Sequence, residues 1–376
     1  MTAPTILFCG GGTGGHLTPG LSVAEELRRL LPGAAIFFLG SGREGEQEWV
    51  RRHGFDWLRG PSAPWGLHPV RAARFALLTT GGVAASLRLL RRLNPSVVVA
   101  LGGYAALPPG LAAAITGRPL VLLEQNAIPG KTNRLLSRWA AEVYTPWPGL
   151  NAAFKRPQRV HATGNPIRPA LRAAPKADAA SAFGLDPTRK TLLVMGGSLG
   201  AAAINNTVAQ ALKTLSDCAT WLQVLHSTGR ATYEETLASY EGVTVPHTVL
   251  PFIDDMAAAY AASSFAIARA GGTSIAEMTA AGLPSALIPL PIAANHHQHA
   301  NARRLQDAGA AILIEQKDFT PQSAAALIRG LGADEPRLAA MSAASRALGA
   351  PRAAETIALR ILDIIRQRPA AVRRVA

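Results

Sequence analysis

Residues 5–16 read TILFCGGGTGGH, a short apolar run that passes directly into a glycine-rich loop. Residues 191–200 read TLLVMGGSLG and repeat the same design. A helical pattern follows each loop, and Gly10 and Gly196 lie 186 residues apart, almost half of the 376-residue chain. In open α/β sheets such loops follow parallel strands, and their N–H groups and the next helix N-terminus bind phosphate groups. The plainer alternative is that the glycines only make tight strand-to-helix turns.

Short apolar runs alternate with helix-length segments through the rest of the chain. They cover residues 35–39, 96–101, 120–123, 265–268 and 285–288. Continuous apolar runs separated by helices are typical of parallel strands that helices cover on both faces. The sequence therefore predicts an α/β protein with two doubly wound, Rossmann-like domains in tandem.

We place the hinge between these domains near Gly164, where residues 164–166 read GNP. The predicted N-terminal domain is then residues 1–163 and the C-terminal domain residues 164–349. Apolar residues at helical spacing predict a helix within residues 350–368, which either ends the second domain or crosses back onto the first. Residues 369–376 are predicted to form a basic tail.

Charge and cysteine content narrow the classes of function. Lys and Arg number 38 against 24 Asp and Glu, a net charge of +14, which indicates an anionic partner. Aromatic residues make up only 6% and are not interleaved with basic runs, so a nucleic-acid-binding protein is a remote alternative. Two cysteines indicate a reducing compartment, and we see no signal peptide. Prolines interrupt the uncharged stretches 97–117 and 278–295, so we expect neither to span a membrane.

The first glycine loop also fits the dinucleotide-binding pattern G-x-G-x-x-G, with Gly10, Gly12 and Gly15 at the glycine positions. That pattern needs an acidic residue at the end of the second strand. Here residues 39–41 read LGS, and Glu44 comes only later. The sequence therefore argues against a nicotinamide-dependent dehydrogenase.

Metal chemistry has little support in the sequence. No Asp-x-Asp sequence is present to hold a nucleotide-bound divalent ion. His296, His297 and His299 form the candidate metal cluster, and we expect them to hydrogen-bond to ligand or solvent instead. We predict no metal and no other cofactor.

Seven colinear motifs resemble the MurG family of undecaprenyldiphospho-muramoylpentapeptide β-N-acetylglucosaminyltransferases, in glycosyltransferase family 28. They are GGTGGH at 11–16, GGY at 102–104, EQNAIPGKTN at 124–133, GNPIR at 164–168, GGSLG at 196–200, FIDDM at 252–256 and RAGGTSIAE at 269–277. The resemblance implies a GT-B fold, in which two Rossmann-like domains face each other across a cleft. It also implies metal-independent, inverting transfer of N-acetylglucosamine from UDP-N-acetylglucosamine to lipid I. The product would be lipid II, a peptidoglycan precursor, made by a peripheral protein on the cytoplasmic side of the bacterial inner membrane.

The resemblance also implies which residues bind UDP-N-acetylglucosamine. Arg168 and Ser198 would contact the diphosphate, Ile253 the uracil and Glu277 the ribose, while Asn126 and Gln298 would bind the sugar. An alternative for Glu277 is a helix-terminal glutamate that interacts with the helix dipole. The full predicted donor set is Thr13, Gly14, Gly15, Asn126, Arg168, Ser198, Ile253, Gly272, Thr273, Ser274, Ile275, Glu277, His297 and Gln298.

The residues predicted to act on the acceptor come from the first half of the chain. His16 is the candidate general base, because an imidazole titrates near neutral pH. It could equally bind the acceptor phosphates as a cation. Glu124 is a second catalytic candidate, and Tyr104 and Asn133 match motif positions on the acceptor side.

A membrane-held acceptor needs an enzyme that docks on an anionic surface. Residues 70–93 combine arginines with apolar side chains, which is typical of an interfacial helix. The predicted membrane patch consists of Arg71, Arg74, Phe75, Leu78 and Arg88. The alternative is an ordinary surface helix with its arginines in water.

Two further enzyme classes remain open at this point. Because fold does not determine function, a GT-B enzyme with another lipid acceptor, or a UDP-sugar 2-epimerase, is the main alternative.

Overall fold

The computed structural model describes residues 3–11, 14–43, 45–62, 69–172, 176–197, 200–293 and 296–367. The chain forms two compact units. Unit 1 comprises Met1–Arg168 and Arg352–Ala376, and unit 2 comprises Pro169–Pro351. The predicted sites Thr13 and Ser198 lie outside the described residues, as do the basic tail and the side chain of Arg71.

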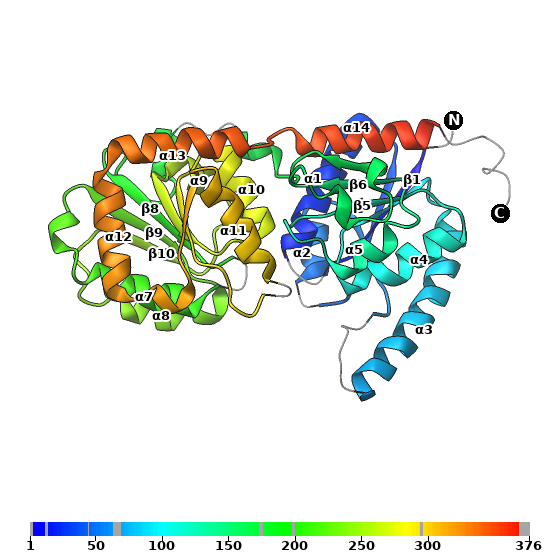
Figure 1. The fold of residues 1–376 in the computed structure, drawn as a ribbon, viewed down its shortest axis with the longest axis horizontal. Helices are drawn as coiled ribbons and strands as arrows, with labels where there is room; N and C mark the ends of the chain where they lie inside the picture. Colours follow the sequence, from blue (N-terminus) through cyan, green and yellow to red (C-terminus); the bar gives the residue numbers. More distant parts are fainter. Residues whose placement is uncertain are drawn as a thin grey trace. The chain divides into compact units, whose positions relative to one another are not determined.

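Unit 1 is built on a seven-stranded sheet in the order β3-β2-β1-β4-β5-β6-β7 (Figure 1). All neighbouring strands run parallel. The strand order reverses between β1 and β4, which is where α/β sheets bind ligands. The strands are β1 (Thr5–Cys9), β2 (Ala35–Gly40), β3 (Asp56–Arg59), β4 (Val97–Ala100), β5 (Leu120–Leu123), β6 (Glu142–Thr145) and β7 (Val160–Ala162).

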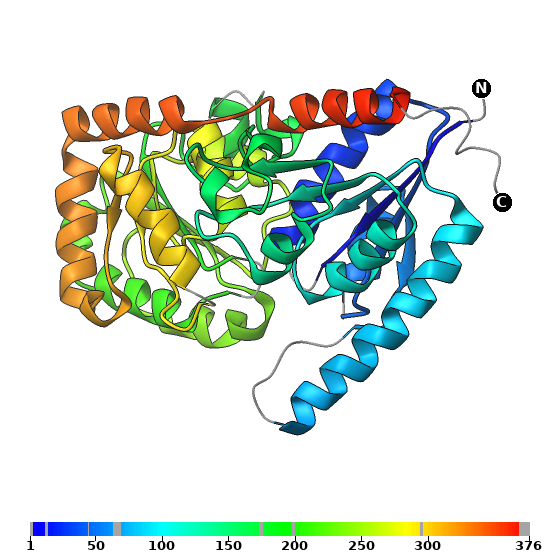
Figure 2. The same cartoon turned by 45° about the vertical axis from the view of Figure 1, so that its right-hand side comes forward.

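Helices cover both faces of this sheet. They are α1 (Gly14–Leu30), α2 (Glu46–Arg52), α3 (Pro69–Leu93), α4 (Leu107–Ile115), α5 (Lys131–Leu136) and α14 (Ala353–Arg366). On one face, α1 and α14 pack against the central strands, and Phe8 of β1 stacks on Phe38 of β2 with ring centroids 4.8 Å apart. On the other face α3 packs against α4, and Figure 2 shows the N-terminal part of α3 extending beyond the sheet of its own unit.

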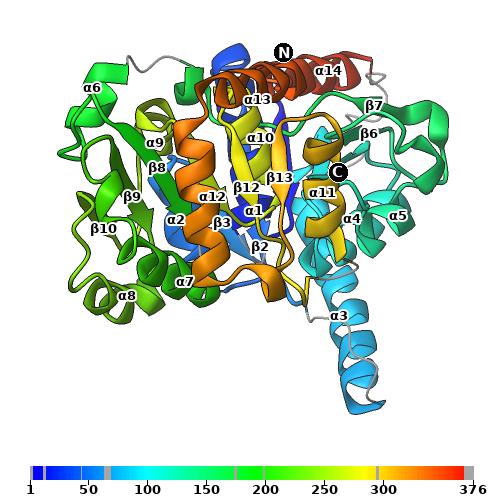
Figure 3. The same cartoon turned by 60° about the vertical axis from the view of Figure 1, so that its left-hand side comes forward.

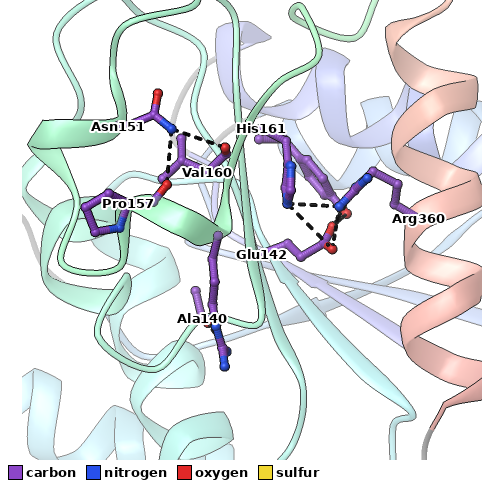
Figure 4. Close-up of polar contacts among 9 residues, drawn as sticks. Ala140, Glu142, Asn151, Pro157, Val160, His161 and Arg360 are labelled. Carbon is purple, nitrogen blue, oxygen red and sulfur yellow. Dashed lines mark hydrogen bonds and ion pairs between the residues drawn. The ribbon is translucent and has the colours of Figure 1, made fainter.

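Helix α14 returns the end of the chain to unit 1. Its residues Ile357, Ile361 and Leu362 are buried at the helical spacing that the sequence predicted. At the sheet edge, Arg360 donates two hydrogen bonds, of 2.8 and 2.7 Å, to the two carboxylate oxygens of Glu142 on β6 (Figure 4). Arg360 also lies 2.9 Å from Nε2 of His161 on β7. Burial opposes ionisation of Glu142, but the hydrogen bonds from Arg360 and Tyr144 and the charges of Arg360 and His161 together outweigh it and hold the pKa of this carboxyl below its ordinary value.

Unit 2 repeats the topology of unit 1 with six strands in the order β10-β9-β8-β11-β12-β13, again all parallel (Figure 3). The reversal lies between β8 and β11. The strands are β8 (Lys190–Met195), β9 (Leu222–Ser227), β10 (His247–Leu250), β11 (Phe265–Ala268), β12 (Ser285–Leu287) and β13 (Ala311–Leu313).

The helices of unit 2 also cover both faces of its sheet. They are α6 (Lys176–Ser181), α7 (Ala202–Leu212), α8 (Tyr233–Ser239), α9 (Met256–Ala262), α10 (Gly272–Ala281), α11 (His297–Asp307), α12 (Pro321–Ala333) and α13 (Glu335–Leu348). A large apolar cluster joins α7, α12 and α13 to one face. The prediction of two doubly wound α/β domains is therefore confirmed. Within the described ranges, no helix has both the length and the apolarity needed to cross a membrane.

Candidate active site

The glycine loops of unit 1 fit closely against each other at the strand-order reversal. Gly10 follows β1, and Gly102 and Gly103 follow β4. A Cβ atom added at Gly10 would lie 2.7 Å from the carbonyl oxygen of Gly102, and one added at Gly103 would lie 3.0 Å from that of Gly11. Gly10, Gly102 and Gly103 also have positive φ angles of 128°, 89° and 72°. Only glycine allows both this backbone conformation and this approach.

The structure brings three of the predicted acceptor-side residues to these loops. His16 lies in the first turn of α1, and its Nε2 atom is 3.6 Å from the point where a Cβ atom added at Gly102 would lie. Nδ2 of Asn133, from α5, is 3.3 Å from the same position. Tyr104 begins the short helix η1 (Tyr104–Ala106) directly after Gly103, and the guanidinium of Arg43 lies 5.6 Å from its ring centroid. His16 and Asn133 therefore both lie against the Gly102 turn, and Tyr104 follows it directly in the chain.

Glu124 follows β5 and is only 4% exposed. Its Oε1 accepts hydrogen bonds from the backbone N–H groups of Gln125 (3.0 Å) and Asn126 (3.1 Å). Its Oε2 accepts from the Gly130 N–H (3.0 Å) and from Asn133 Nδ2 (2.9 Å). Burial raises the pKa of this carboxyl, although the four hydrogen bonds oppose the rise. The contacts of Glu124 fix the backbone of the loop that carries Asn126.

The remaining predicted residues of unit 1 lie apart from one another along the chain. Gly14 and Gly15 form the start of α1. Asn126 is partly buried in the loop that Glu124 holds. Arg168 is partly exposed and is the last residue of unit 1 before the chain enters unit 2.

The second glycine loop follows β8 and leads into α7. Gly200 has a φ angle of 76°, and a Cβ atom there would lie 2.1 Å from the carbonyl oxygen of Thr228. Thr228 is held in turn by Asn205 of α7, whose Nδ2 donates a 2.9 Å hydrogen bond to the same oxygen. The tight turn at the carboxyl end of β8 is therefore built into the packing of unit 2.

The predicted uracil- and ribose-binding residues follow the carboxyl ends of β10 and β11. Gly272, Thr273, Ser274 and Ile275 form the first turn of α10, and the side chain of no N-cap residue caps this turn, because Gly271 stands at the N-cap. The N–H of Ile275 donates a 3.0 Å hydrogen bond to the carbonyl oxygen of Gly271. Ile253, in the loop after β10, is 2% exposed.

Glu277 lies in the second turn of α10, and its Oε2 accepts a 3.0 Å hydrogen bond from the hydroxyl of Tyr260. This position lies outside the first turn, where a helix dipole acts most strongly. A role for Glu277 as a helix-dipole partner is therefore disfavoured.

Of the predicted sugar-binding residues, His297 and Gln298 lie at the start of α11, which follows the loop after β12. Oε1 of Gln298 accepts a 2.9 Å hydrogen bond from the backbone N–H of Leu290, across this loop. His297 is the first residue of α11 and is partly buried. His299 lies 2.9 Å from Glu315. Among the described residues, which include His296, His297 and His299, no group of three His, Cys, Asp or Glu side chains is placed to hold a metal ion.

Family models match both units. The N-terminal domain model of glycosyltransferase family 28 matches residues 6–145, and its C-terminal domain model matches residues 191–357. The chain belongs to glycosyltransferase family 28. Together the two models cover most of the chain, including both glycine loops.

Enzymes whose sequences are about 40% identical to this chain share one name. The chain is similar to the UDP-N-acetylglucosamine–N-acetylmuramyl-(pentapeptide) pyrophosphoryl-undecaprenol N-acetylglucosamine transferase of Nitratidesulfovibrio vulgaris strain DP4, with 39% identity over 97% of this chain and 99% of the relative. The enzyme of the same name from Alkalilimnicola ehrlichii is 42% identical over 95% of this chain and 98% of its own length.

Solved structures show the same fold. The crystal structure of MurG from Acinetobacter baumannii superposes with a TM-score of 0.76 at 29% identity, over 96% of this chain and 99% of that one. A UDP-N-acetylglucosamine 2-epimerase from Neisseria meningitidis gives a TM-score of 0.69 at 14% identity, over 96% and 100% of the two chains, which establishes likeness of fold alone.

Sequence reasoning missed two buried charged side chains, one in each unit. Arg269 was part of a motif but had no role, and it is 8% exposed directly after β11. Glu46 of α2 is 5% exposed and accepts hydrogen bonds from Ser41 Oγ (2.8 Å) and Gly42 N (2.9 Å) after β2. A charged residue directly after a buried strand was the available signal for Arg269. No local signal marks Glu46, because its partners become neighbours only in the folded loop.

The predicted membrane patch lies on α3. Arg74 and Arg88 are exposed, and Phe75 and Leu78 are partly buried. Leu77, next to them, is 72% exposed. Arg88 also lines a cavity of about 330 Å³ beside α3, together with Arg59, Arg92, Leu58, Leu89 and neighbouring residues. Basic and apolar groups therefore share the exposed side of this helix.

Proposed function

We propose that this protein is an inverting glycosyltransferase that moves N-acetylglucosamine from UDP-N-acetylglucosamine to lipid I, forming lipid II for peptidoglycan synthesis. The observation that carries this proposal is the likeness, along nearly the whole chain, to enzymes named for this transfer. The two glycine loops at the strand-order reversals support it, because such loops suit phosphate-bearing substrates.

On the donor side, the leaving UDP gains negative charge as the glycosidic bond breaks. We assign stabilisation of that charge to the guanidinium of Arg168 and to the loop of Ser198. Ile253 and the turn from Gly272 to Ile275 would contact uracil. Glu277 would accept hydrogen bonds from the ribose hydroxyls, since a carboxylate has two acceptor oxygens.

For the donor sugar, we assign recognition to Asn126 and Gln298, with His297 beside it. An amide side chain offers one acceptor and two donor hydrogens, which suits sugar hydroxyls and an acetamido group. Oε1 of Gln298 is occupied by the Leu290 N–H, so its NH₂ group is the part that would face the sugar.

On the acceptor side, the accepting hydroxyl must lose a proton as it attacks. We assign this proton to His16 rather than to Glu124. The oxygens of Glu124 already accept four hydrogen bonds, so proton uptake there would disturb the loop of Asn126. The imidazole of His16 lies beside the Gly102 turn together with Asn133.

We further propose that the transfer needs no metal ion, because Arg168 and loop N–H groups can balance the diphosphate charge. Turnover should persist after exhaustive treatment with EDTA. Loss of turnover in EDTA, followed by recovery on adding magnesium, would overturn this part of the proposal.

We propose that the protein docks peripherally on the cytoplasmic side of the inner membrane through the exposed side of α3. Arg74, Arg88 and Leu77 supply the basic and apolar groups, and each basic residue near an anionic surface contributes about 1 kcal/mol. Flotation with liposomes should show binding that rises with anionic lipid content and falls with salt. Binding that changes with neither the anionic lipid content nor the salt concentration would refute the electrostatic part of this docking proposal.

A transfer assay tests the main proposal. UDP-N-acetylglucosamine, UDP-glucose and UDP-galactose are each incubated with and without lipid I. We expect UDP release and lipid II formation only with UDP-N-acetylglucosamine and lipid I together. Conversion of the UDP-sugar without any acceptor would favour the 2-epimerase alternative, and transfer to a different lipid would correct the acceptor.

A further inference from the structure

Arg269 connects three segments at the carboxyl edge of the unit 2 sheet. Its NH1 group donates hydrogen bonds to the carbonyl oxygens of Ile288 (3.0 Å) and Pro289 (3.2 Å), which begin the loop after β12. Its NH2 group donates a 2.7 Å hydrogen bond to Oε1 of Gln316, in the short helix η8 (Gln316–Asp318) after β13. Gln316 therefore holds the guanidinium in the orientation that fixes the start of this loop.

The other end of the same loop is held by the residue next to Gln316. Oε1 of Glu315 lies 2.9 Å from Nε2 of His299, in the first turn of α11. Figure 3 shows β13 and α11 side by side, and the two elements are in contact. Between these two anchors, Gln298 accepts its hydrogen bond from the Leu290 N–H. Two consecutive residues after β13 are thus linked to the two ends of the segment from Pro289 to Gln298, Gln316 through Arg269 and Glu315 through His299, which directly follows Gln298.

We propose that Glu315 and Gln316 act together as a brace that positions Gln298 and so sets the selectivity for the donor sugar. This inference rests on the proposed function, in which Gln298 binds the sugar. Glu315 and Gln316 are positioning residues, because they act through Arg269 and His299. The residues assigned to uracil and ribose lie on the loop after β10 and on α10, and neither brace residue has a hydrogen bond to them among the described contacts.

The physical reason is that amide recognition of a sugar depends on direction. A site built to hydrogen-bond a substrate group rejects an analogue without that group, because the site's polar atoms are then left unpaired. That rejection requires the amide to stay in place. A loosened loop would weaken binding of the sugar while leaving the nucleotide contacts intact.

The test compares binding of UDP and of UDP-N-acetylglucosamine by calorimetry, without an acceptor. In Gln316→Ala we expect the Kd of UDP to stay within two-fold and the Kd of UDP-N-acetylglucosamine to rise about ten-fold, as for the loss of one hydrogen bond to a charged group. Glu315→Ala should act in the same direction, more weakly, because its pair with His299 is partly exposed. Selectivity for UDP-N-acetylglucosamine over UDP-glucose in kcat/KM should fall in both variants.

Two further variants make the result specific. Gln316→Glu keeps an acceptor for Arg269 and should restore the UDP-N-acetylglucosamine Kd to within about three-fold of the original. Gln322→Ala removes an exposed glutamine from the start of α12 and is the matched control. Melting temperatures of all variants show that each one is folded.

The inference is overturned if the Kd values of UDP and UDP-N-acetylglucosamine rise in the same proportion. It is also overturned if Gln316→Ala binds both ligands as Gln322→Ala does. Failure of the proposed function would look different. The unaltered protein would then bind UDP-N-acetylglucosamine no better than UDP, or would transfer no sugar to lipid I.

Discussion

Replacing Glu124 by glutamine separates a positioning role from a catalytic one. The carboxylate accepts four hydrogen bonds, two on each oxygen. A glutamine keeps the shape but has a single carbonyl oxygen. It can satisfy one pair of donors, and its NH₂ group must then face the other pair, either the N–H groups of Gln125 and Asn126 or those of Gly130 and Asn133.

The size of the effect follows from this mismatch. A buried donor left without an acceptor costs about 1–3 kcal/mol, so two such donors cost roughly 2–6 kcal/mol. Removal of the buried charge offsets part of this loss, because burial disfavours the ionised carboxylate and raises its pKa. We expect the free energy of unfolding of unit 1 to fall by about 2–4 kcal/mol, which lowers its melting temperature by roughly 5–15 °C.

Calorimetric unfolding and steady-state kinetics measure the two consequences. In Glu124→Gln, the KM for UDP-N-acetylglucosamine should rise because the loop of Asn126 loosens. The pH dependence of kcat should keep its shape, because His16 still takes the proton. Glu48→Gln is the control, since Glu48 is 67% exposed in a surface pair with Arg52 and its replacement should change stability by less than about 0.5 kcal/mol.

A different outcome would refute this reasoning. If Glu124→Gln kept its melting temperature and donor KM but lost the pH dependence of kcat, Glu124 would be the general base. His16 would then have to bind the acceptor phosphates.

Four further predictions concern other parts of the chain. His16→Ala should lower kcat about 10²- to 10⁴-fold while the UDP Kd stays within two-fold, and an unchanged kcat would remove it as the base. Gly200→Ala places a Cβ atom 2.1 Å from a backbone carbonyl oxygen, so it should weaken UDP binding and lower the melting temperature. Gly184→Ala is the control, because Gly184 has a φ of 66° but open space around it, and this variant should lose only about 1–2 kcal/mol of stability through backbone strain. Arg360→Ala should lower the free energy of unfolding of unit 1 by about 1–2 kcal/mol, allowing for solvent screening, and a denaturant titration that shows no change would contradict the role given to this pair. Burial lowers the pKa of His226 to about 3, below the 6.5 of an unperturbed histidine. The contribution of neutral His226 to the free energy of unfolding is therefore complete above pH 6.5 and is lost at about 1.4 kcal/mol per pH unit as the pH falls toward 3. This pH dependence of the free energy of unfolding should disappear in His226→Gln.

The sequence alone predicted the architecture because the signals for it are local. Apolar runs of strand length followed by glycines predicted β1 and β8, and alternation with helical segments predicted two doubly wound sheets. The hydrophobic spacing of residues 357–365 predicted a helix near the end of the chain. That spacing did not show which domain this helix packs against. The structure places α14 in unit 1, where it contacts α1 and where Arg360 pairs with Glu142.

Tertiary structure decided the roles of individual polar side chains. Nothing within the segment 124–133 shows that Glu124 accepts three hydrogen bonds from its own loop and one from Asn133 of α5, because that result depends on how the loop folds after β5. Likewise, Arg269 and Gln316 are 47 residues apart in the chain, and they meet because parallel strands bring successive loops to one edge of the sheet. Strand and helix periodicity is encoded over a few residues, whereas a buried hydrogen bond between distant residues exists only after the sheet has formed. The sequence therefore determined the fold of this protein, and the folded sheet determined which of its polar residues meet.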